Sequence, residues 1–232
     1  MKEQWQRQIM LLGEEKQESL HSMHVAVFGI GGVGSFAAEA LARAGVGRLT
    51  LVDHDTVSVS NLNRQLIALH STVGKFKVDV MAERIADINP GCKVTVIRSF
   101  YDAEHREAFF CEPYDYIADA IDSVPSKTDL IASAIGRGIP IISSMGTGNR
   151  LDPSKFKICD LSETSGCPLA RVMRQRLPKL GIEHHTVLSS TEPPVSPIRD
   201  GSIPENVPGS AAWVPPCAGM MIAGFIVRAL SE

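Results

Sequence analysis

Residues 24–44 place a short apolar run, a glycine-rich turn and a helix-type pattern directly after one another. The apolar run covers 24–29, and the turn reads Gly29-Ile30-Gly31-Gly32-Val33-Gly34. Residues 35–44 are rich in Ala, Leu and Glu with helical periodicity. A strand that leads through a glycine turn into a helix is typical of a nucleotide-binding βαβ unit. The chain is therefore expected to adopt an α/β fold.

Strand-type and helix-type patterns continue to alternate after this unit. A second apolar run at 48–52 completes it, and 75–88 has apolar residues three and four apart. The other expected strands are 93–97, 114–118, 140–144, 155–161 and 186–190, and the other expected helices are 102–111, 125–137, 168–177 and 211–230. We predict a Rossmann-type, doubly wound, mainly parallel sheet with helices on both faces and a C-terminal sheet extension.

Length and composition favour a single domain over 1–232. The chain has 232 residues, of which 44% are hydrophobic, enough to bury a sizeable core. Residues 191–210 contain several prolines and no hydrophobic periodicity, which predicts a mobile loop. The apolar run 211–230 is interrupted by Pro215 and Pro216 and is too short to span a bilayer comfortably. It is expected to form a buried helix, and no membrane partner is expected.

Charge and cysteine usage restrict the partners and the compartment. The formal net charge is −3, so binding of nucleic acid would need a local basic patch. The five cysteines form no CxxC pair and no zinc-finger spacing, which fits reduced thiols in a cytosol. The first residues are charged and amide side chains, unlike a signal peptide. A cytoplasmic location is expected.

The four glycines of the turn, Gly29, Gly31, Gly32 and Gly34, predict a nucleotide site. Residues without a side chain let backbone N–H groups and the positive end of a helix approach phosphate oxygens. Asp53 ends the second strand, where a carboxylate can accept hydrogen bonds from ribose hydroxyls. NAD, FAD and ATP satisfy these features equally, and a glycine turn also occurs as a plain tight connection.

Polar and cationic residues after the second strand favour ATP over a redox cofactor. These residues are Asn61, Arg64, Gln65 and Lys77. Attack at the α-phosphorus of a triphosphate builds negative charge on the pyrophosphate, which Arg64 and Lys77 would neutralise. Asp122 follows another expected strand at the same edge, where it would hold Mg²⁺ beside the phosphates.

The ordered set of motifs resembles the adenylation domain of the ubiquitin-activating-enzyme-like (ThiF/MoeB/HesA) superfamily. The matching positions are Arg7-Gln8, 29–34, Asp53, 61–65, Lys77 and Asp122. The resemblance implies that Asp53 binds ribose, that the Asn, Arg and Lys contact phosphates, and that Asp122 coordinates Mg²⁺. It also implies that Arg7 reaches into the site of a partner subunit, so that the working form is a homodimer.

The second half of the chain resembles one branch of that superfamily, the tRNA threonylcarbamoyladenosine dehydratases. The matching segments are 152–161, 168–177 and 189–194. The resemblance implies that ATP activates the threonyl carboxylate of a modified adenosine beside the anticodon. The acyl-adenylate then closes onto a nitrogen of the same group, giving cyclic threonylcarbamoyladenosine. The expected partner is therefore tRNA.

Two other functions remain open. An adenylyltransferase that activates the C-terminus of a ubiquitin-like or sulfur-carrier protein would use the same residues. Such members usually have two CxxC zinc pairs and a catalytic cysteine, and no two cysteines here have zinc-ligand spacing. A non-catalytic nucleotide-binding scaffold would keep the fold without turnover. No residue pattern names a further sulfur-relay or tRNA-modification partner.

A basic segment in the second half is a candidate for contact with tRNA phosphates. The cations on or just beyond the expected helix 168–177, with three that precede it, are Arg171, Arg174, Arg176, Lys179, Arg150, Lys155 and Lys157. Basic clusters bind the phosphate backbone largely without regard to base sequence. A solvated helix face without any ligand is an equal alternative.

Overall fold

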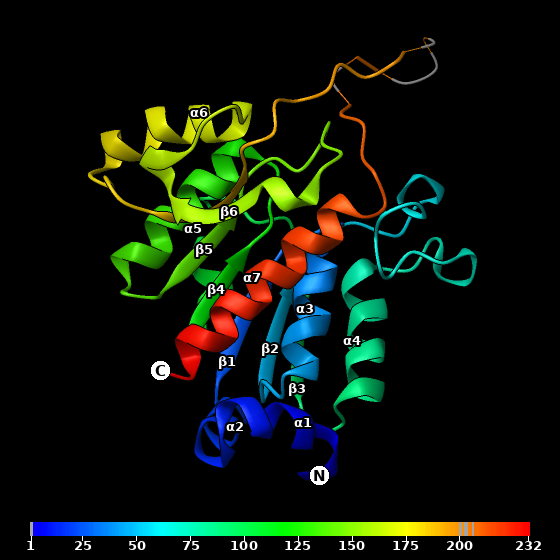
Figure 1. The fold of residues 1–232 in the computed structure, drawn as a ribbon, viewed down its shortest axis with the longest axis vertical. Helices are drawn as coiled ribbons and strands as arrows, with labels where there is room; N and C mark the ends of the chain where they lie inside the picture. The colour runs from blue at the N-terminus through cyan, green and yellow to red at the C-terminus, as the bar shows by residue number, and fades with distance from the viewer. Residues whose placement is uncertain (1, 200, 202–203, 206) are drawn as a thin grey trace.

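The protein, seen in a computed structural model, is a seven-stranded sheet with helices on both faces (Figure 1). The structure describes residues 2–199, 201, 204, 205 and 207–232. The strands are β1 (His24–Phe28), β2 (Arg48–Val52), β3 (Lys93–Ile97), β4 (Tyr116–Asp119), β5 (Ile141–Ser144), β6 (Phe156–Asp160) and β7 (Thr186–Ser190). The α-helices are α1 (Lys2–Leu12), α2 (Glu14–Leu20), α3 (Gly34–Arg43), α4 (Lys77–Ile88), α5 (Val124–Gly136), α6 (Pro168–Arg176) and α7 (Val214–Leu230).

The strand order in the sheet is β3-β2-β1-β4-β5-β7-β6. All neighbouring strands run parallel except β6, which pairs antiparallel with β7 at the edge. The chain winds outward in one direction from β1 to β3 and in the other from β4, so β1 and β4 flank the switch point where ligands bind in such sheets. The predicted doubly wound, mainly parallel sheet with a C-terminal extension is confirmed.

Each face of the sheet has its own apolar core. Val25 and Val27 of β1 belong to the core under α3, α4 and α7, whereas Ala26 and Phe28 belong to the core under α5 and α6. This alternation follows from the period of two in a strand. Helices α3 and α7 approach closely because Gly219 of α7 has no side chain: an added Cβ there would lie 2.3 Å from the carbonyl oxygen of Val33, at the start of α3.

The prediction of a helix at 102–111 is wrong. The structure has only a short 3₁₀ turn there, Arg106–Phe109. The side chain of Asp102 accepts a hydrogen bond from the backbone N–H of His105, and Phe109 packs against Phe28 in the core. Burying this aromatic ring under β1 stabilises an irregular path over a regular helix. The other predicted helices are present, with α4 beginning at Lys77 instead of residue 75.

The two ends of the sheet differ in what covers them. Helices α1 and α2 lie beyond the ends where the strands begin, and the chain that follows β7 leaves the opposite end (Figure 1). The described residues of 191–213 form no helix or strand. Positions 200, 202, 203 and 206 of the loop predicted to be mobile lie outside the described residues. Among the described helices, none is long and apolar enough to cross a membrane.

Candidate active site

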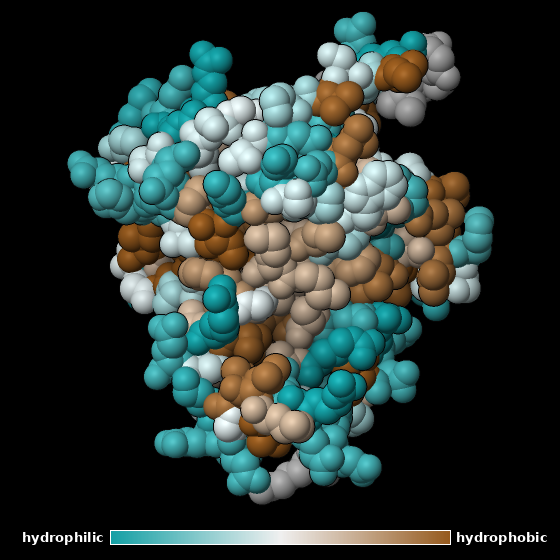
Figure 2. Space-filling model, in the orientation of Figure 1, coloured by the Kyte–Doolittle hydropathy of each residue, from teal (hydrophilic) through white to brown (hydrophobic). Residues whose placement is uncertain are grey.

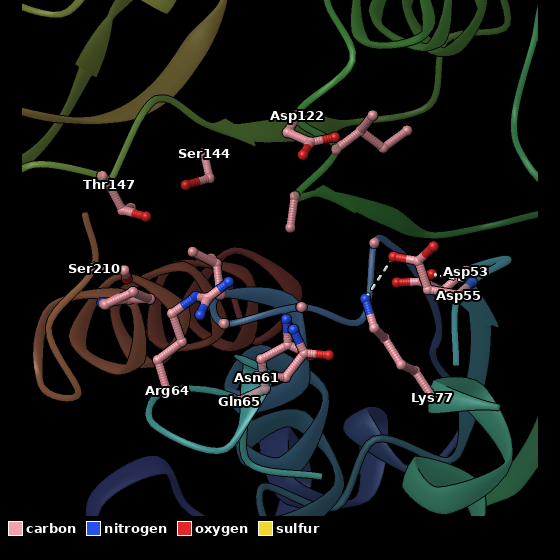
Figure 3. A pocket seen from close by; sticks show the side chains of 18 of the residues that line it. Asp53, Asp55, Asn61, Arg64, Gln65, Lys77, Asp122, Ser144, Thr147 and Ser210 are labelled. Atoms are coloured by element: carbon pink, nitrogen blue, oxygen red, sulfur yellow. Dashed lines mark hydrogen bonds and ion pairs between the residues drawn. The ribbon is translucent and has the colours of Figure 1, made fainter. Parts of the chain in front are cut away.

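A cavity of about 570 Å³ opens at the carboxyl ends of β1, β2, β4 and β5. It brings together most residues that the sequence predicted to bind a nucleotide (Figure 3). The predicted residues that line it are Gly29, Gly31, Gly32, Asp53, Asn61, Arg64, Gln65, Lys77 and Asp122. Segments far apart in the sequence therefore meet at the switch point of the sheet.

The glycine turn delivers the N-terminus of α3 to this cavity. Gly29 has φ of +87°, and an added Cβ there would lie 2.8 Å from the carbonyl oxygen of Ala120. An added Cβ at Gly34 would lie 1.7 Å from the carbonyl oxygen of Gly29. Gly29 and Gly34 are thus required by the backbone path, while Gly31 and Gly32 line the cavity. Helix N-termini favour anions, so the turn can hold phosphate.

The carboxylate of Asp53 is fixed between the turn and the loop after β2. Its Oδ2 accepts a hydrogen bond from the backbone N–H of Ile30 at 2.7 Å, and its Oδ1 accepts one from the N–H of Asp55 at 2.9 Å. Each oxygen keeps a further lone pair that can accept from a hydroxyl. A ribose diol is the group that such a fixed carboxylate at the end of β2 recognises.

Lys77 and Asp55 form an ion pair on the cavity wall. The Nζ atom of Lys77 lies 2.7 Å from Oδ2 of Asp55. The lysine side chain is only 7% exposed, whereas that of Asp55 is 50% exposed. Sequence reasoning missed Asp55, because an acidic residue in an irregular loop is usually a solvated side chain. The pair shows that Lys77 has a fixed position before any phosphate binds.

Asn61, Arg64 and Gln65 approach from the loop between β2 and α4. Asn61 accepts a hydrogen bond from the N–H of Ser58 through Oδ1 at 3.0 Å, which leaves its –NH₂ group as a donor. Arg64 is held by the carbonyl of Ser60 at 2.9 Å. The Oε1 atom of Gln65 is buried without a hydrogen-bond partner in the described structure. A buried polar atom without a partner is costly, so this site fits a polar ligand.

Asp122 lies on the loop after β4, above a buried ion pair. Asp119 and Lys127 are both 0% exposed, and Nζ of Lys127 lies 2.7 Å from Oδ2 of Asp119. The other oxygen of Asp119 accepts a hydrogen bond from the N–H of Ile121 at 3.0 Å. Burial lowers the pKa of His185, which faces this pair, to about 4, so its ring is neutral at neutral pH. The pair thus fixes the start of the loop that presents Asp122.

Two groups of carboxylates in the cavity have the chemistry to hold a divalent cation. One is Asp122, which is exposed at the cavity edge. The other is Asp53, His54 and Asp55, whose ligand atoms lie within 4.8 Å of one another. Mg²⁺ prefers oxygen ligands and usually binds through one or two carboxylates together with phosphates. Either group fits that pattern, since both line the same cavity as the glycine turn.

The end of the cavity away from Asp53 is lined by hydroxyl groups that sequence reasoning missed. Figure 3 shows Ser144, Thr147 and Ser210 there, with the guanidinium of Arg64 pointing into the space between them and the rest of the site. The positions of Ser144 and Thr147 were open to prediction, because β5 ends at the same edge of the sheet. Ser210 follows an irregular segment and had no such signal.

Arg7 lies far from the cavity of its own chain. It is exposed on α1, at the opposite end of the sheet (Figure 1). It therefore has no contact with the nucleotide residues of the same subunit.

The proposed basic patch is smaller than the sequence suggested. Arg171, Arg176, Lys155, Lys157 and Lys179 are exposed. Arg150 is only 2% exposed and donates a hydrogen bond to the carbonyl of Gly166 at 3.0 Å, so its inclusion in a surface patch is wrong. Arg174 also turns inward, to the carbonyl of Thr164 at 2.8 Å. Tertiary contacts with the loop before α6 draw both side chains in.

The site can hold a nucleotide and neutralise charge that develops on its phosphates. Backbone N–H groups, Arg64 and Lys77 supply positive potential, and Asp53 supplies a fixed acceptor. Tyr101 lines the same cavity, but burial raises the pKa of its phenol, which donates to Asp129 at 2.8 Å. It therefore keeps its proton. This arrangement suits displacement at phosphorus, in which positioning and charge neutralisation dominate.

Known proteins match almost the whole chain. The model of the ThiF family matches residues 5–231. The tRNA threonylcarbamoyladenosine dehydratase of Bacillus subtilis (strain 168) is 45% identical over 245 residues, covering 99% of this chain and 95% of the relative. The crystal structure of E. coli tRNA N6-threonylcarbamoyladenosine dehydratase in complex with AMP matches this chain with a TM-score of 0.91 and 38% sequence identity. The structure of the same enzyme in complex with ATP matches with a TM-score of 0.90 and 36% identity. Each covers 99% of this chain and 94% of the E. coli chain.

Proposed function

The chain belongs to the ThiF family, and we propose that it is an ATP-dependent tRNA threonylcarbamoyladenosine dehydratase. The observation with most weight is the similarity to dehydratases over nearly the full length of both chains, which includes structures with ATP and AMP bound. The cavity is consistent with this function, because the glycine turn, Arg64 and Lys77 line it together with several hydroxyl side chains.

The reaction joins two displacements. A carboxylate oxygen of the threonyl group attacks the α-phosphorus of ATP, and the P–O bond to pyrophosphate breaks. A nitrogen of the same modified group then attacks the acyl carbon, its proton leaves, and the C–O bond to AMP breaks. The net change in the nucleoside is the loss of one water. Because the attacking nitrogen is tethered to the acyl carbon, ring closure needs no nucleophile from the enzyme.

The site residues have separate roles in this proposal. Asp53 binds the ribose of ATP, and the glycine turn with Asn61 and Gln65 holds the phosphates. Arg64 and Lys77 neutralise the charge that builds on the leaving pyrophosphate. Asp122 would hold Mg²⁺, which would supply positive charge beside the phosphates. The proposed location is the cytoplasm, where tRNA and ATP are present.

One assay tests this function directly. The purified protein is incubated with ATP, Mg²⁺ and tRNA bearing threonylcarbamoyladenosine, and the digested nucleosides are analysed by mass spectrometry. A nucleoside lighter by one water is expected only when ATP and Mg²⁺ are both present. Chelation of the metal is the matched control for Mg²⁺. ATP consumption without any change in the nucleoside would overturn the proposal and point to a carrier-protein substrate, and ATP binding without turnover would indicate a scaffold.

We also propose that the working form is a homodimer in which Arg7 completes the site of the partner subunit. Met10 and Leu11 on the same helix are 84% and 85% exposed, an unusual degree for large apolar side chains. Figure 2 shows further apolar surface over α7 in the middle of the face drawn. Met220 of α7 is 47% exposed. Exposed apolar patches of this kind mark protein contacts.

Mixed dimers test the role of Arg7. Arg7→Ala and Arg64→Ala are each expected to be nearly inactive alone, because every site then lacks one cation. After the two variants are mixed and subunits exchange, one site of each mixed dimer has both arginines, so product formation should return. Sedimentation before and after mixing checks the dimeric state. Activity that does not recover in proven mixed dimers would show that Arg7 does not act across the interface.

A further inference from the structure

The loop after β5 is joined to the segment before α7 by hydrogen bonds centred on Asn149. The backbone N–H of Asn149 donates to the carbonyl of Gly209 at 2.8 Å, and the N–H of Gly209 donates back to Oδ1 of Asn149 at 2.7 Å. The carbonyl of Asn149 accepts a third bond from the N–H of Val195 at 2.8 Å. One residue thus holds both ends of the long segment. We call Asn149, Val195 and Gly209 the Asn149 clamp.

The backbone at the clamp has an unusual conformation. Asn149 has φ of +57° and is the only non-glycine residue in the left-handed region among the residues that the structure describes. Asparagine tolerates this region better than most residues, because its short side chain bonds locally. Beside it, an added Cβ at Gly148 would lie 2.7 Å from Cβ of Pro208. Asn149 needs a left-handed backbone, and Gly148 needs the absence of a side chain, at the same contact. Unusual backbone conformations of this kind are found most often at functional sites.

The clamp lies directly beside the hydroxyl end of the cavity. Thr147 is two residues before Asn149, and Ser210 follows Gly209. Thr147, Gly148, Pro208 and Ser210 all line the cavity. In Figure 3, Thr147 and Ser210 lie at the same end, opposite Asp53 and Lys77. The clamp thus fixes how two separate chain segments present their hydroxyls to one space.

We propose that the Asn149 clamp positions an acceptor subsite, formed by Ser144, Thr147 and Ser210, that binds the acylated nucleoside of tRNA. The inference rests on the proposed function. Because Asp53 fixes the ribose end of ATP, the second reactant enters at the other end. Its threonyl and carbamoyl groups present a hydroxyl, N–H groups and carbonyl oxygens, which hydroxyl side chains can both donate to and accept from. Leu169 and Val207 also line the cavity and add apolar surface to it.

Asn149 acts in this proposal as a positioning residue. It does not line the cavity, and its hydrogen bonds run to the backbone of the segment that includes Ser210. Loss of the Oδ1 bond would let Ser210 move relative to Thr147 while the glycine turn, Asp53 and Lys77 keep their contacts. The KM for modified tRNA should therefore change independently of the KM for ATP.

Two variants of Asn149 separate the side chain from the backbone requirement. Asn149→Gly keeps the positive φ at little cost but removes the Oδ1 acceptor, whereas Asn149→Asp keeps an acceptor oxygen at the same place. Asn149→Gly is expected to raise the KM for modified tRNA roughly fivefold to tenfold, the effect of about one lost hydrogen bond. Its KM for ATP should stay within about twofold of the value for the unsubstituted protein. Both KM values of Asn149→Asp should be close to those of the unsubstituted protein.

A second pair tests the subsite itself if the glycine variant unfolds early. Thr147→Val removes the hydroxyl at almost constant volume and should raise the KM for modified tRNA, while Thr147→Ser should not. The assay is initial-rate formation of dehydrated nucleoside, with thermal unfolding as the check of folding. Equal changes in the KM for ATP and for tRNA, or an unchanged KM for modified tRNA in both Thr147→Val and Asn149→Gly, would overturn the acceptor subsite. No product from the unsubstituted protein would contradict the proposed function, and the acceptor assignment with it.

Discussion

Replacing Arg64 with alanine is expected to lower kcat/KM for dehydration by about 10²-fold to 10³-fold, the usual cost of removing one group that stabilises transition-state charge. Arg64 points into the cavity between the glycine turn and the hydroxyl end. Its charge is therefore close to the leaving pyrophosphate in the proposed reaction. Arg64→Lys should recover only part of kcat/KM, because the ammonium group of lysine is a single point charge, whereas the guanidinium group of arginine is planar and offers several N–H donors. Formation of AMP and of dehydrated nucleoside would be measured together.

A matched arginine provides the control for this variant. Arg43 lies at the end of α3 away from the glycine turn, and its side chain is 55% exposed in a pair with Glu39. Arg43→Ala should leave kcat/KM unchanged within about twofold, since Arg43 does not line the cavity and Glu39 keeps its second partner, Arg84. If Arg64→Ala turned over like Arg43→Ala, the assignment of Arg64 to the phosphates would be wrong.

Replacing Lys127 with methionine is expected to lower the free energy of unfolding by about 3–5 kcal/mol, the usual cost of breaking a buried ion pair from one side. Lys127 and Asp119 are fully buried and 2.7 Å apart. Without the lysine, the carboxylate of Asp119 has no opposite charge and no access to water. Urea unfolding followed by circular dichroism would measure the loss.

The double variant separates charge from packing. Asp119→Asn with Lys127→Met removes both charges, and it should recover much of the stability that Lys127→Met loses. The surface pair of Arg98 and Asp79, 2.9 Å apart and with Arg98 53% exposed, is the control. Arg98→Ala should cost no more than about 1 kcal/mol. A Lys127→Met variant as stable as Arg98→Ala would contradict the importance of the buried pair.

The sequence predicted that the candidate nucleotide-binding residues lie together, because their placement depends on short-range spacing. The glycine turn, the Asp at the end of the second strand and the Asn, Arg and Gln that follow lie within 29–65. A βαβ unit has one favoured handedness, and parallel strands end at the same edge of a sheet. These rules placed Asp53 and the turn together without any tertiary information, and the structure places both on one cavity.

Elements whose form depends on distant partners were harder to predict. The segment 102–111 has helix-type composition, yet it is held in an irregular path by Phe109 under β1 and by the local bond of Asp102. The sequence placed Arg150 in a candidate surface patch, whereas it is buried and donates to the carbonyl of Gly166. Periodicity in a sequence reports which side of an element is apolar, and it does not report which other segment will cover that side.

The sequence by itself determined the class of fold and the edge of the sheet at which the glycine turn and Asp53 meet. Those features follow from backbone sterics at glycine and from the regular geometry of parallel strands. Only the tertiary structure decided that Asp55 pairs with Lys77, that Lys127 neutralises Asp119, and that Asn149 joins the loop after β5 to Gly209. Each of these contacts joins two separate segments of the chain, and the partners are selected by burial and by hydrogen-bond geometry that form only when the chain is packed.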